Sequence, residues 1–371
     1  MPSYNKEIFI PNTQKVIGED DVFVIAEIGK NFIQTKEERP VEEYLQNAKD
    51  LVDAAVDAGA DAVKFQTHEI EDEQMDVDII SPHFRGSDRY SWVKRNTEAT
   101  PIEEFWKPLK EYCDEKGIIF FSTPMSRKAA IKLEKVGVPM WKVGSGDVSD
   151  YAMLDFLVST KKPIIISSGM VSLSELDEIM GYLRSKNTPI VLLYCVSKYP
   201  APPEYFNLST IEHLKEKYPE SVVGFSDHSL GSDAALSAVK LGARVIEKHF
   251  SLNRDLWGSD HKVSMTPSEM KEMVIAIRDG SYKDIDEAPY YGTKERELDG
   301  SHNEFRPYFN KALVAGEDVT AGTVLTKEMV FAMRPLMHID GLPANRFYDV
   351  IGKHLKRGLD KYEPIKQEDL E

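Results

Sequence analysis

Eight short apolar runs, most of them rich in β-branched residues, alternate with segments of helical periodicity along most of the chain. The runs cover residues 22–28, 62–66, 118–122, 140–143, 163–167, 190–195, 222–226 and 245–250. Between them, segments such as 41–58 and 173–183 repeat apolar residues at every third or fourth position, as amphipathic helices do. A strand followed by a helix, repeated eight times, predicts a (β/α)8 TIM barrel in the α/β class. The alternative is a doubly wound open sheet, but the order of units carries no reversal signal.

The chain is longer than one barrel requires. It has 371 residues, whereas a barrel needs about 250, so a smaller second unit is expected. After a last predicted helix at 267–278 the sequence becomes polar and rich in turn residues. We therefore predict a catalytic barrel (residues 1–280), a linker (281–311) and a C-terminal unit (312–371). At about 60 residues this unit is near the lower limit for an independent core, so we expect it to dock over the active site.

Charge and composition narrow the choice of partner. The net charge is −16 and the pI about 5.1, which disfavours nucleic acid and anionic membranes and favours a small molecule. The two cysteines, Cys113 and Cys195, do not have the spacing of a thiolate metal site. The N-terminus lacks the apolar segment of a signal peptide, and no apolar run approaches the ~20 residues that span a bilayer. We expect a cytoplasmic protein.

Two histidines stand at the ends of consecutive apolar runs. His228 follows the run 222–226, and His249 lies at the end of the run 245–250. Neutral imidazole binds divalent ions, and a nearby carboxylate such as Asp227 or Glu247 can orient the ring. One isolated histidine would be read as a hydrogen-bonded core residue. Two at matching strand ends favour a metal site.

Polar side chains follow almost every predicted strand, where the active site of a TIM barrel lies. They are Glu27, Lys64, Gln66, Ser122, Thr123, Lys142, Ser145, Asp147, Ser167, Ser168, Ser197, Tyr199, Ser226, His228 and His249. The two lysines, the serine hydroxyls and the glycine-rich backbone at 144–146 and 168–169 are what a phosphate and a carboxylate require. With carboxylates at Glu27, Asp147 and Asp260, the set predicts carbon–carbon bond formation between a phosphorylated carboxylate and a metal-polarised carbonyl.

These residues also carry a family resemblance that runs nearly from end to end of the chain. The motifs are Ala26-Glu27-Ile28-Gly29 with Asn31, Lys64-Phe65-Gln66-Thr67-His68, Phe121-Ser122-Thr123-Pro124, Lys142-Val143-Gly144-Ser145-Gly146, Ser168-Gly169-Met170, Cys195 with Tyr199-Pro200, Gly224-Phe225-Ser226-Asp227-His228, Glu247-Lys248-His249-Phe250, and Asp260 with Ser264-Met265. In these motifs the chain resembles the sialic acid (N-acetylneuraminate) synthases of the NeuB type. Residues 312–371 resemble their antifreeze-like SAF domain. Two departures are Phe32, where relatives usually carry histidine, and Asp147, where many carry glutamate.

The resemblance implies an enzyme that condenses phosphoenolpyruvate with an N-acylated hexosamine aldehyde and water to form a nonulosonic acid. The sugar is typically N-acetylmannosamine or a dideoxy-diacetamido analogue, and phosphate leaves by carbon–oxygen cleavage. His228 and His249 would bind Mn²⁺ or Mg²⁺ and, with Glu27 and Asp147, form the catalytic set. By the same resemblance, phosphoenolpyruvate would contact Lys64, Lys142, Ser145, Ser167, Ser197 and Ser226, and the sugar would contact Glu27, Gln66, Tyr199 and Asp260, with Thr123 also binding substrate.

The resemblance further implies a domain-swapped homodimer, in which Arg334 of the SAF domain reaches into the barrel of the other subunit. Two alternatives from other classes remain. A class I aldolase would form a Schiff base at Lys64 or Lys142 and need no metal. A non-catalytic protein would bind a glycan precursor without turnover, although the complete set of strand-end residues argues against it.

Overall fold

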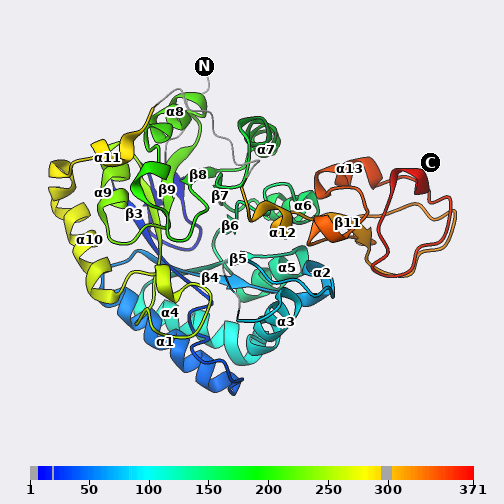
Figure 1. The fold of residues 1–371 in the computed structure, drawn as a ribbon, viewed down its shortest axis with the longest axis horizontal. Coiled ribbons are helices and arrows are strands. Elements are labelled where there is room, and N and C mark those ends of the chain that lie inside the picture. The colour runs from blue at the N-terminus through cyan, green and yellow to red at the C-terminus, as the bar shows by residue number, and fades with distance from the viewer. Residues whose placement is uncertain (1–6, 19–20, 83, 85, 294–302) are drawn as a thin grey trace.

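A barrel of parallel strands forms the centre of the molecule (Figure 1). The computed structural model describes residues 7–18, 21–82, 84, 86–293 and 303–371. The barrel strands are β3 (Phe23–Gly29), β4 (Ala62–Thr67), β5 (Ile119–Pro124), β6 (Trp141–Val143), β7 (Ile164–Ser167), β8 (Ile190–Cys195), β9 (Val222–Asp227) and β10 (Val245–His249). They follow one another in sequence order, β3 pairs with β10, and β5 lies beside β6 where the ladder ends. The predicted barrel is confirmed, and the doubly wound sheet is wrong because the strand order never reverses.

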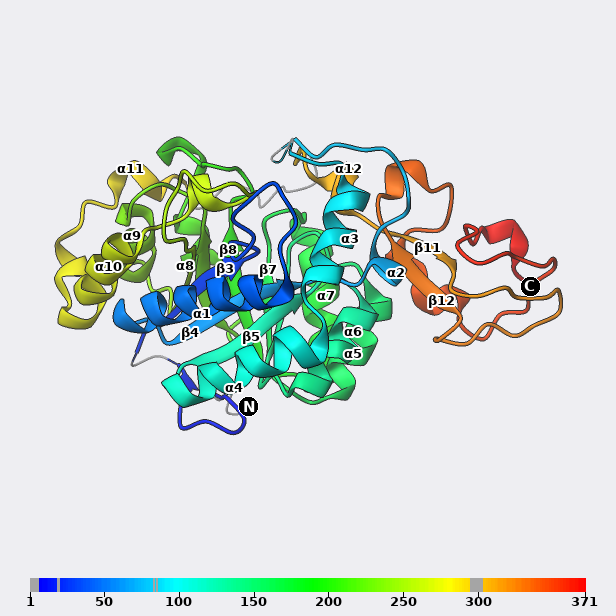
Figure 2. The ribbon, with the colours of Figure 1, turned by 90° about the horizontal axis from the view of Figure 1, so that it is seen from below.

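Helices cover the outside of this barrel (Figures 1 and 2). They are α1 (Val41–Asp57), α2 (Ile70–Glu73), α3 (Arg89–Ala99), α4 (Lys107–Lys116), α5 (Arg127–Val136), α6 (Tyr151–Ser159), α7 (Leu173–Ser185), α8 (Ser209–Lys217), α9 (Asp233–Lys240) and α10 (Pro267–Asp279). Short π or 3₁₀ turns are η1 (Ile102–Trp106), η2 (Pro203–Tyr205) and η3 (His261–Val263). Local signals set the helix ends: α4 and α5 stop at Gly117 and Gly137, with left-handed φ angles of 71° and 87°. A capping box between Ser172 and Glu175 starts α7.

A hairpin that was not predicted closes the amino end of the barrel. Its strands, β1 (Ile8–Phe9) and β2 (Val16–Ile17), pair antiparallel. Ile8 and Ile17 join the same buried cluster as Phe23 and Ala62, which stand at the starts of barrel strands. This apolar seal covers one end of the barrel and leaves the carboxyl ends of the strands for the site.

The C-terminal unit is built around a two-stranded antiparallel ladder of β11 (Ala312–Ala315) and β12 (Val330–Met333). It also contains η5 (Leu336–His338), η6 (Ala344–Arg346), α13 (Phe347–Val350) and η7 (Gln367–Asp369). The unit extends to one side of the barrel, where β12 packs against α2 (Figure 2). The backbone N–H of Arg334 donates to the Glu73 carbonyl, and the Met75 N–H donates to the Arg334 carbonyl, each at 2.9 Å. These bonds fix the end of β12 at the rim of the barrel.

The predicted linker, residues 281–311, contains short helical segments. These are η4 (Ser281–Asp284), α11 (Ala288–Tyr291) and α12 (Arg306–Phe309). Its residues 294–302 lie outside the described residues. Within the described part of the chain, no helix has the length and apolar character needed to cross a membrane.

Candidate active site

One pocket lies at the carboxyl ends of the barrel strands, and most of the polar residues predicted from the strand ends line it. The predicted residues in its lining are Glu27, Lys64, Gln66, Thr123, Lys142, Ser145, Asp147, Ser167, Ser197, Tyr199, Ser226, His228, His249, Asp260 and Arg334. Ser122 and Ser168 do not line it: the Ser122 hydroxyl lies 2.8 Å from that of Thr67, and the Ser168 hydroxyl donates to the Leu193 carbonyl at 3.1 Å. The parallel arrangement brings together strand ends that are far apart in sequence, because all carboxyl ends meet at one rim. The structure thus groups the predicted residues, whereas their individual roles stay predictions.

Four charged side chains form a buried cluster on the floor of the pocket. The Lys64 ammonium lies 2.5 Å from a Glu27 oxygen and 3.7 Å from a Glu247 oxygen. Lys142 lies 3.9 Å from a Glu247 oxygen. The Ser226 hydroxyl donates a hydrogen bond to Glu247 at 3.1 Å. Buried charges are stable only when they are paired and hydrogen-bonded. Each carboxylate here is paired with a lysine and accepts one hydrogen bond, whereas the second oxygen of Glu27 and of Glu247 has no hydrogen-bond partner among the described residues.

The cluster shifts the acidity of its members in opposite directions. Burial raises the pKa of Glu27 to about 7 even though Lys64 opposes the shift. Burial also acts on Glu247, but Lys142 and Lys64 outweigh it and hold the pKa of Glu247 below its usual value. Burial lowers the pKa of Lys142. Glu27 can therefore hold or release a proton near neutral pH, as a general acid or base must.

Hydroxyl groups from neighbouring strand ends extend the cluster. Lys64 donates to the Thr123 hydroxyl at 3.1 Å, and Lys142 donates to the Ser167 hydroxyl at 2.5 Å. All four side chains are buried. Two ammonium groups held by hydroxyls form a preorganised site for an anion.

The two histidines face each other across neighbouring strand ends. Their ring centroids are 5.4 Å apart, and the Tyr199 ring lies 4.2 Å from that of His228. The Nδ1 of His228 lies 2.9 Å from the Val196 carbonyl, which can only accept, so Nδ1 donates, and in the neutral ring Nε2 is the nitrogen that is free to bind a metal ion. The Nδ1 of His249 is buried, with no partner among the described residues.

This pair fits a metal site to which the protein gives two imidazoles. Within the described ranges, no group of three or more His, Cys, Asp or Glu side chains could hold a metal ion. Metal binding remains a prediction.

Asp147 is held by two cations from beyond the barrel. The Arg334 guanidinium donates to its carboxylate, and the Lys311 ammonium lies 2.8 Å from the same group and 2.7 Å from Asp150. Arg334 also donates to the Met125 carbonyl at 3.3 Å. The resemblance implied an arginine from the partner subunit, whereas here Arg334 lies in the pocket of its own chain.

A hydrogen-bonded chain lines another wall of the pocket. Lys30 donates to the side-chain amide oxygen of Gln66 at 2.7 Å, and the side-chain amide nitrogen of Gln66 donates to Glu27 at 2.8 Å. Lys30 also lies 3.9 Å from Asp260. This chain links the floor cluster to the residues expected to contact the sugar.

The segment before the C-terminal unit closes part of the opening. The Asn303 amide donates to the Ser197 carbonyl at 3.0 Å, and the Ser197 hydroxyl lies 3.4 Å from that of Ser145. Phe305 and Phe309 line the pocket from this segment. The site therefore combines barrel strands with residues from the predicted linker.

The pocket lining also includes residues that were not predicted as site residues, among them Lys30, His68, Arg89, Phe305 and Phe309. His68 is the last residue of the motif that begins at Lys64 and directly follows β4, so its place after a strand was the signal that could have found it. Arg89 lies in a polar helix and gave no such signal, and it is buried here, with its guanidinium 4.6 Å from the Phe309 ring centroid.

Comparisons with known proteins agree with this architecture. Residues 51–284 match the NeuB family, and residues 310–371 match the SAF domain. The chain is 32% identical to spore coat polysaccharide biosynthesis protein SpsE of Bacillus subtilis, with 91% of this chain and 90% of that protein covered. It is 29% identical to human N-acetylneuraminate-9-phosphate synthase, over 95% of this chain and 93% of that protein.

A solved structure is similar to this chain over nearly its whole length. The crystal structure of SpsE from Bacillus subtilis superposes with a TM-score of 0.77 at 30% identity, covering 98% of this chain and 99% of that one. The family match spans more than half of the chain, and the structural likeness spans nearly all of it. The chain belongs to the NeuB family and carries a C-terminal SAF domain.

Proposed function

We propose that this protein is a nonulosonic acid synthase. It would condense phosphoenolpyruvate with an N-acylated hexosamine aldehyde and water, and release phosphate by carbon–oxygen cleavage. One observation carries the proposal: two buried lysines with hydroxyl partners share a pocket with carboxylates and two facing histidines. Binding of an enol phosphate needs the lysines and hydroxyls, and activation of an aldehyde needs the carboxylates and histidines.

The lysines would bind the anionic substrate. Lys64 and Lys142, with Ser167, offer charge-assisted donors to the carboxylate and phosphate of phosphoenolpyruvate. Because the whole chain carries a net charge of −16, this local positive site is needed to retain a multiply charged anion. Ser145, Ser197 and Ser226 would complete the set of donors.

The carboxylates would handle positive charge and protons. Carbon 3 of phosphoenolpyruvate attacks the aldehyde carbon, and positive charge develops at carbon 2, where a nearby carboxylate stabilises it. Glu27, with a pKa of about 7, can give a proton to the sugar oxygen that becomes a hydroxyl. Asp147, fixed by Arg334 and Lys311, would act beside the reacting carbons when water adds at carbon 2. The resulting tetrahedral carbon then expels phosphate.

A divalent ion, Mn²⁺ or Mg²⁺, would be held by His228 and His249. When bound, it supplies a Lewis acid that polarises an oxygen of the substrate. Tyr199 packs on the His228 ring and would limit the positions available to the sugar, together with Gln66 and Asp260. A cytoplasmic location, expected from the two cysteines and the N-terminal sequence, and a domain-swapped homodimer, implied by the resemblance, remain proposals.

A class I aldolase is the second candidate, because burial lowers the pKa of Lys142 and a neutral amine can attack a carbonyl. Borohydride trapping with pyruvate distinguishes the two reactions. The synthase predicts no covalent adduct, whereas the aldolase predicts a reduced adduct on Lys142 or Lys64.

The proposed reaction is tested by phosphate release from phosphoenolpyruvate with a panel of aldehydes. The panel contains N-acetylmannosamine, its 6-phosphate and a dideoxy-diacetamido hexose, each with Mn²⁺ or Mg²⁺. With ¹⁸O in the bridging position of phosphoenolpyruvate, carbon–oxygen cleavage leaves the label in phosphate. Label retained in the sugar acid, or no release with any sugar, would contradict the proposal.

A further inference from the structure

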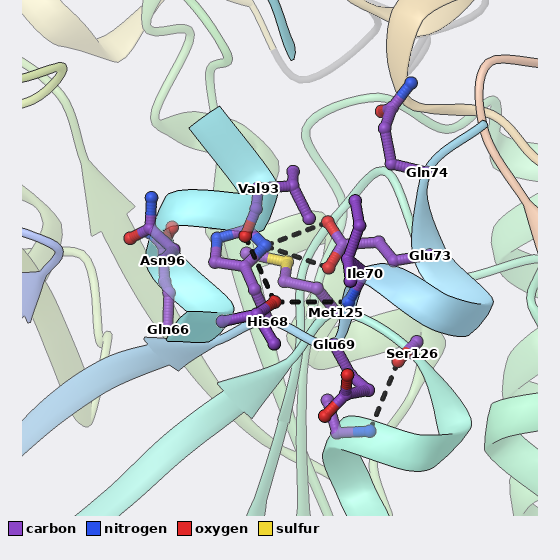
Figure 3. A network of polar contacts seen from close by, with 12 residues as sticks. Gln66, His68, Glu69, Ile70, Glu73, Gln74, Val93, Asn96, Met125 and Ser126 are labelled. Atoms are coloured by element: carbon purple, nitrogen blue, oxygen red, sulfur yellow. Dashed lines mark hydrogen bonds and ion pairs between the residues drawn. The ribbon is translucent and has the colours of Figure 1, made fainter. Parts of the chain in front are cut away.

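His68 lies in the pocket wall with one ring nitrogen unused. The residue follows directly after β4, is 3% exposed and lines the pocket. Its Nδ1 lies 2.9 Å from both carboxylate oxygens of Glu73, at the end of α2, and Figure 3 shows these two side chains pointing toward each other. Its Nε2 is buried and has no hydrogen-bond partner among the described residues. A buried polar atom without a partner costs free energy unless a ligand or water satisfies it.

The partner at Nδ1 determines what Nε2 can do. Burial opposes ionisation of Glu73, but His68, Arg334 and Lys311 outweigh it and lower the pKa of Glu73 to about 2. An ionised carboxylate only accepts, so Nδ1 of His68 carries the proton. Burial lowers the pKa of His68, and the charges of Lys30 and Arg89 act in the same direction against the attraction of Glu73. The ring is then neutral, and Nε2 is a hydrogen-bond acceptor.

An acceptor on the pocket wall distinguishes between the two substrates of the proposed reaction. The second pKa of a phosphate monoester is about 6, so phosphoenolpyruvate at neutral pH is essentially without N–H or O–H groups. An N-acyl amino sugar carries several hydroxyls and an amide N–H. A site with an unpaired acceptor rejects ligands that lack the donor more strongly than an apolar site does.

We propose that Nε2 of His68 accepts a hydrogen bond from a hydroxyl or amide N–H of the amino sugar and so selects the second substrate. This inference rests on the proposed function and adds a residue for the sugar. Glu73 is a positioning residue, because it acts through the His68 ring. The backbone bond from Arg334 to the Glu73 carbonyl fixes α2, so the C-terminal unit supports the same wall.

The test compares two substitutions at His68. His68→Phe keeps the ring volume and removes the acceptor, whereas His68→Gln places a carbonyl oxygen near the position of Nε2. With N-acetylmannosamine as the probe, we expect His68→Phe to raise the sugar KM about tenfold, which matches the loss of one hydrogen bond. The KM for phosphoenolpyruvate should stay within about twofold of the wild-type value, and His68→Gln should recover most of the sugar affinity.

Two further variants separate selection from a packing effect. Glu73→Gln can donate to Nδ1 and thereby reverse the tautomer, so it should raise the sugar KM without changing that of phosphoenolpyruvate. Asn96, in α3, is buried but does not line the pocket. Asn96→Leu should change the melting temperature and leave both KM values unchanged.

The outcomes also separate this inference from the proposed function. A wild-type protein that releases no phosphate with any sugar of the panel overturns the proposed function and this inference with it. An active wild type with an unchanged sugar KM in His68→Phe overturns the inference alone. Equal increases in both KM values, or no recovery in His68→Gln, would assign His68 a structural role and also overturn it. If His68→Phe does not fold, Glu73→Gln provides the test: an unchanged sugar KM in that variant would overturn the inference.

Discussion

Single residues in this pocket depend on their immediate neighbours for their chemistry. Glu27 and Glu247 contact the same lysine, yet burial raises the pKa of Glu27, whereas Lys142 and Lys64 lower that of Glu247. Two carboxylates in one cluster thus take different protonation states at neutral pH, which is how acid and base roles are divided in a site.

The pKa of Glu27 predicts a pH dependence of stability. The pKa of Glu27 is about 7 in the folded protein, whereas its ordinary value is 4.5. Between pH 4.5 and about 7 the folded protein therefore holds a proton on Glu27 that the unfolded chain has lost. Stability contributed by this group is therefore lost as the pH rises from about 4.5 to about 7. In Glu27→Gln this contribution is absent, and the melting temperature should fall less over that range than in the wild type. Thermal melts at several pH values check this, and identical slopes would contradict the assignment.

The lysines of the floor cluster predict a selective loss of phosphoenolpyruvate binding. Lys64→Ala or Lys142→Ala removes a charge-assisted contact of about 1.5 to 3 kcal/mol, which is a roughly 10- to 100-fold increase in KM. The KM for the sugar should change far less.

Lys248 is the matched control, because it is a buried lysine paired with Asp227 at 2.6 Å and does not line the pocket. Lys248→Met should lower stability and spare the KM for phosphoenolpyruvate, and unchanged phosphoenolpyruvate kinetics in both alanine variants would remove the lysines from the site.

At the scale of elements, the strands were predictable and the pocket walls were not. Each predicted strand lies within two residues of the observed one, because buried parallel strands are continuous apolar runs with clear ends. Strand ends converge, so most of the residues read from them line one pocket. The hairpin of β1 and β2 was missed because two-residue strands carry no periodicity. Phe32, where the resemblance implied a histidine, lies in the core against Phe65 and Phe105.

The histidines at the ends of β9 and β10 lead to a prediction about metal binding. His228→Ala and His249→Ala should each abolish Mn²⁺ binding measured by calorimetry, because each removes one of two imidazoles offered by the described residues. The fold should persist, since these side chains line the pocket and the apolar core lies elsewhere. Circular dichroism provides the control for folding. Wild-type affinity for Mn²⁺ in both variants would exclude the two histidines as ligands.

At the scale of the whole molecule, the position of the C-terminal unit is fixed by contacts that two assemblies can share. Arg334 and Lys311 contact Asp147, and β12 is bonded to the backbone of Glu73 and Met75. An exchanged dimer would form the same contacts between this unit and the barrel of the partner, and only the path through residues 281–311 would differ. The resemblance predicts the dimer in which the C-terminal units are exchanged. An experiment that mixes two inactive variants distinguishes this dimer from an assembly without exchange.

Arg334→Ala and His228→Ala are each expected to be nearly inactive as homodimers, because each site then lacks a residue of the pocket. In a mixed dimer with exchanged units, the barrel of the Arg334→Ala chain keeps both histidines and receives an intact arginine from the other chain. One complete site forms, so activity should return to about half of the wild-type value per mixed dimer. Without exchange, each barrel keeps its own defect, and no activity returns.

Subunit exchange is verified with two affinity tags, and phosphate release by the purified mixed dimer is the measurement. A verified mixed dimer that stays inactive would show that Arg334 serves the barrel of its own chain, as in Figure 2, where the C-terminal unit packs beside α2.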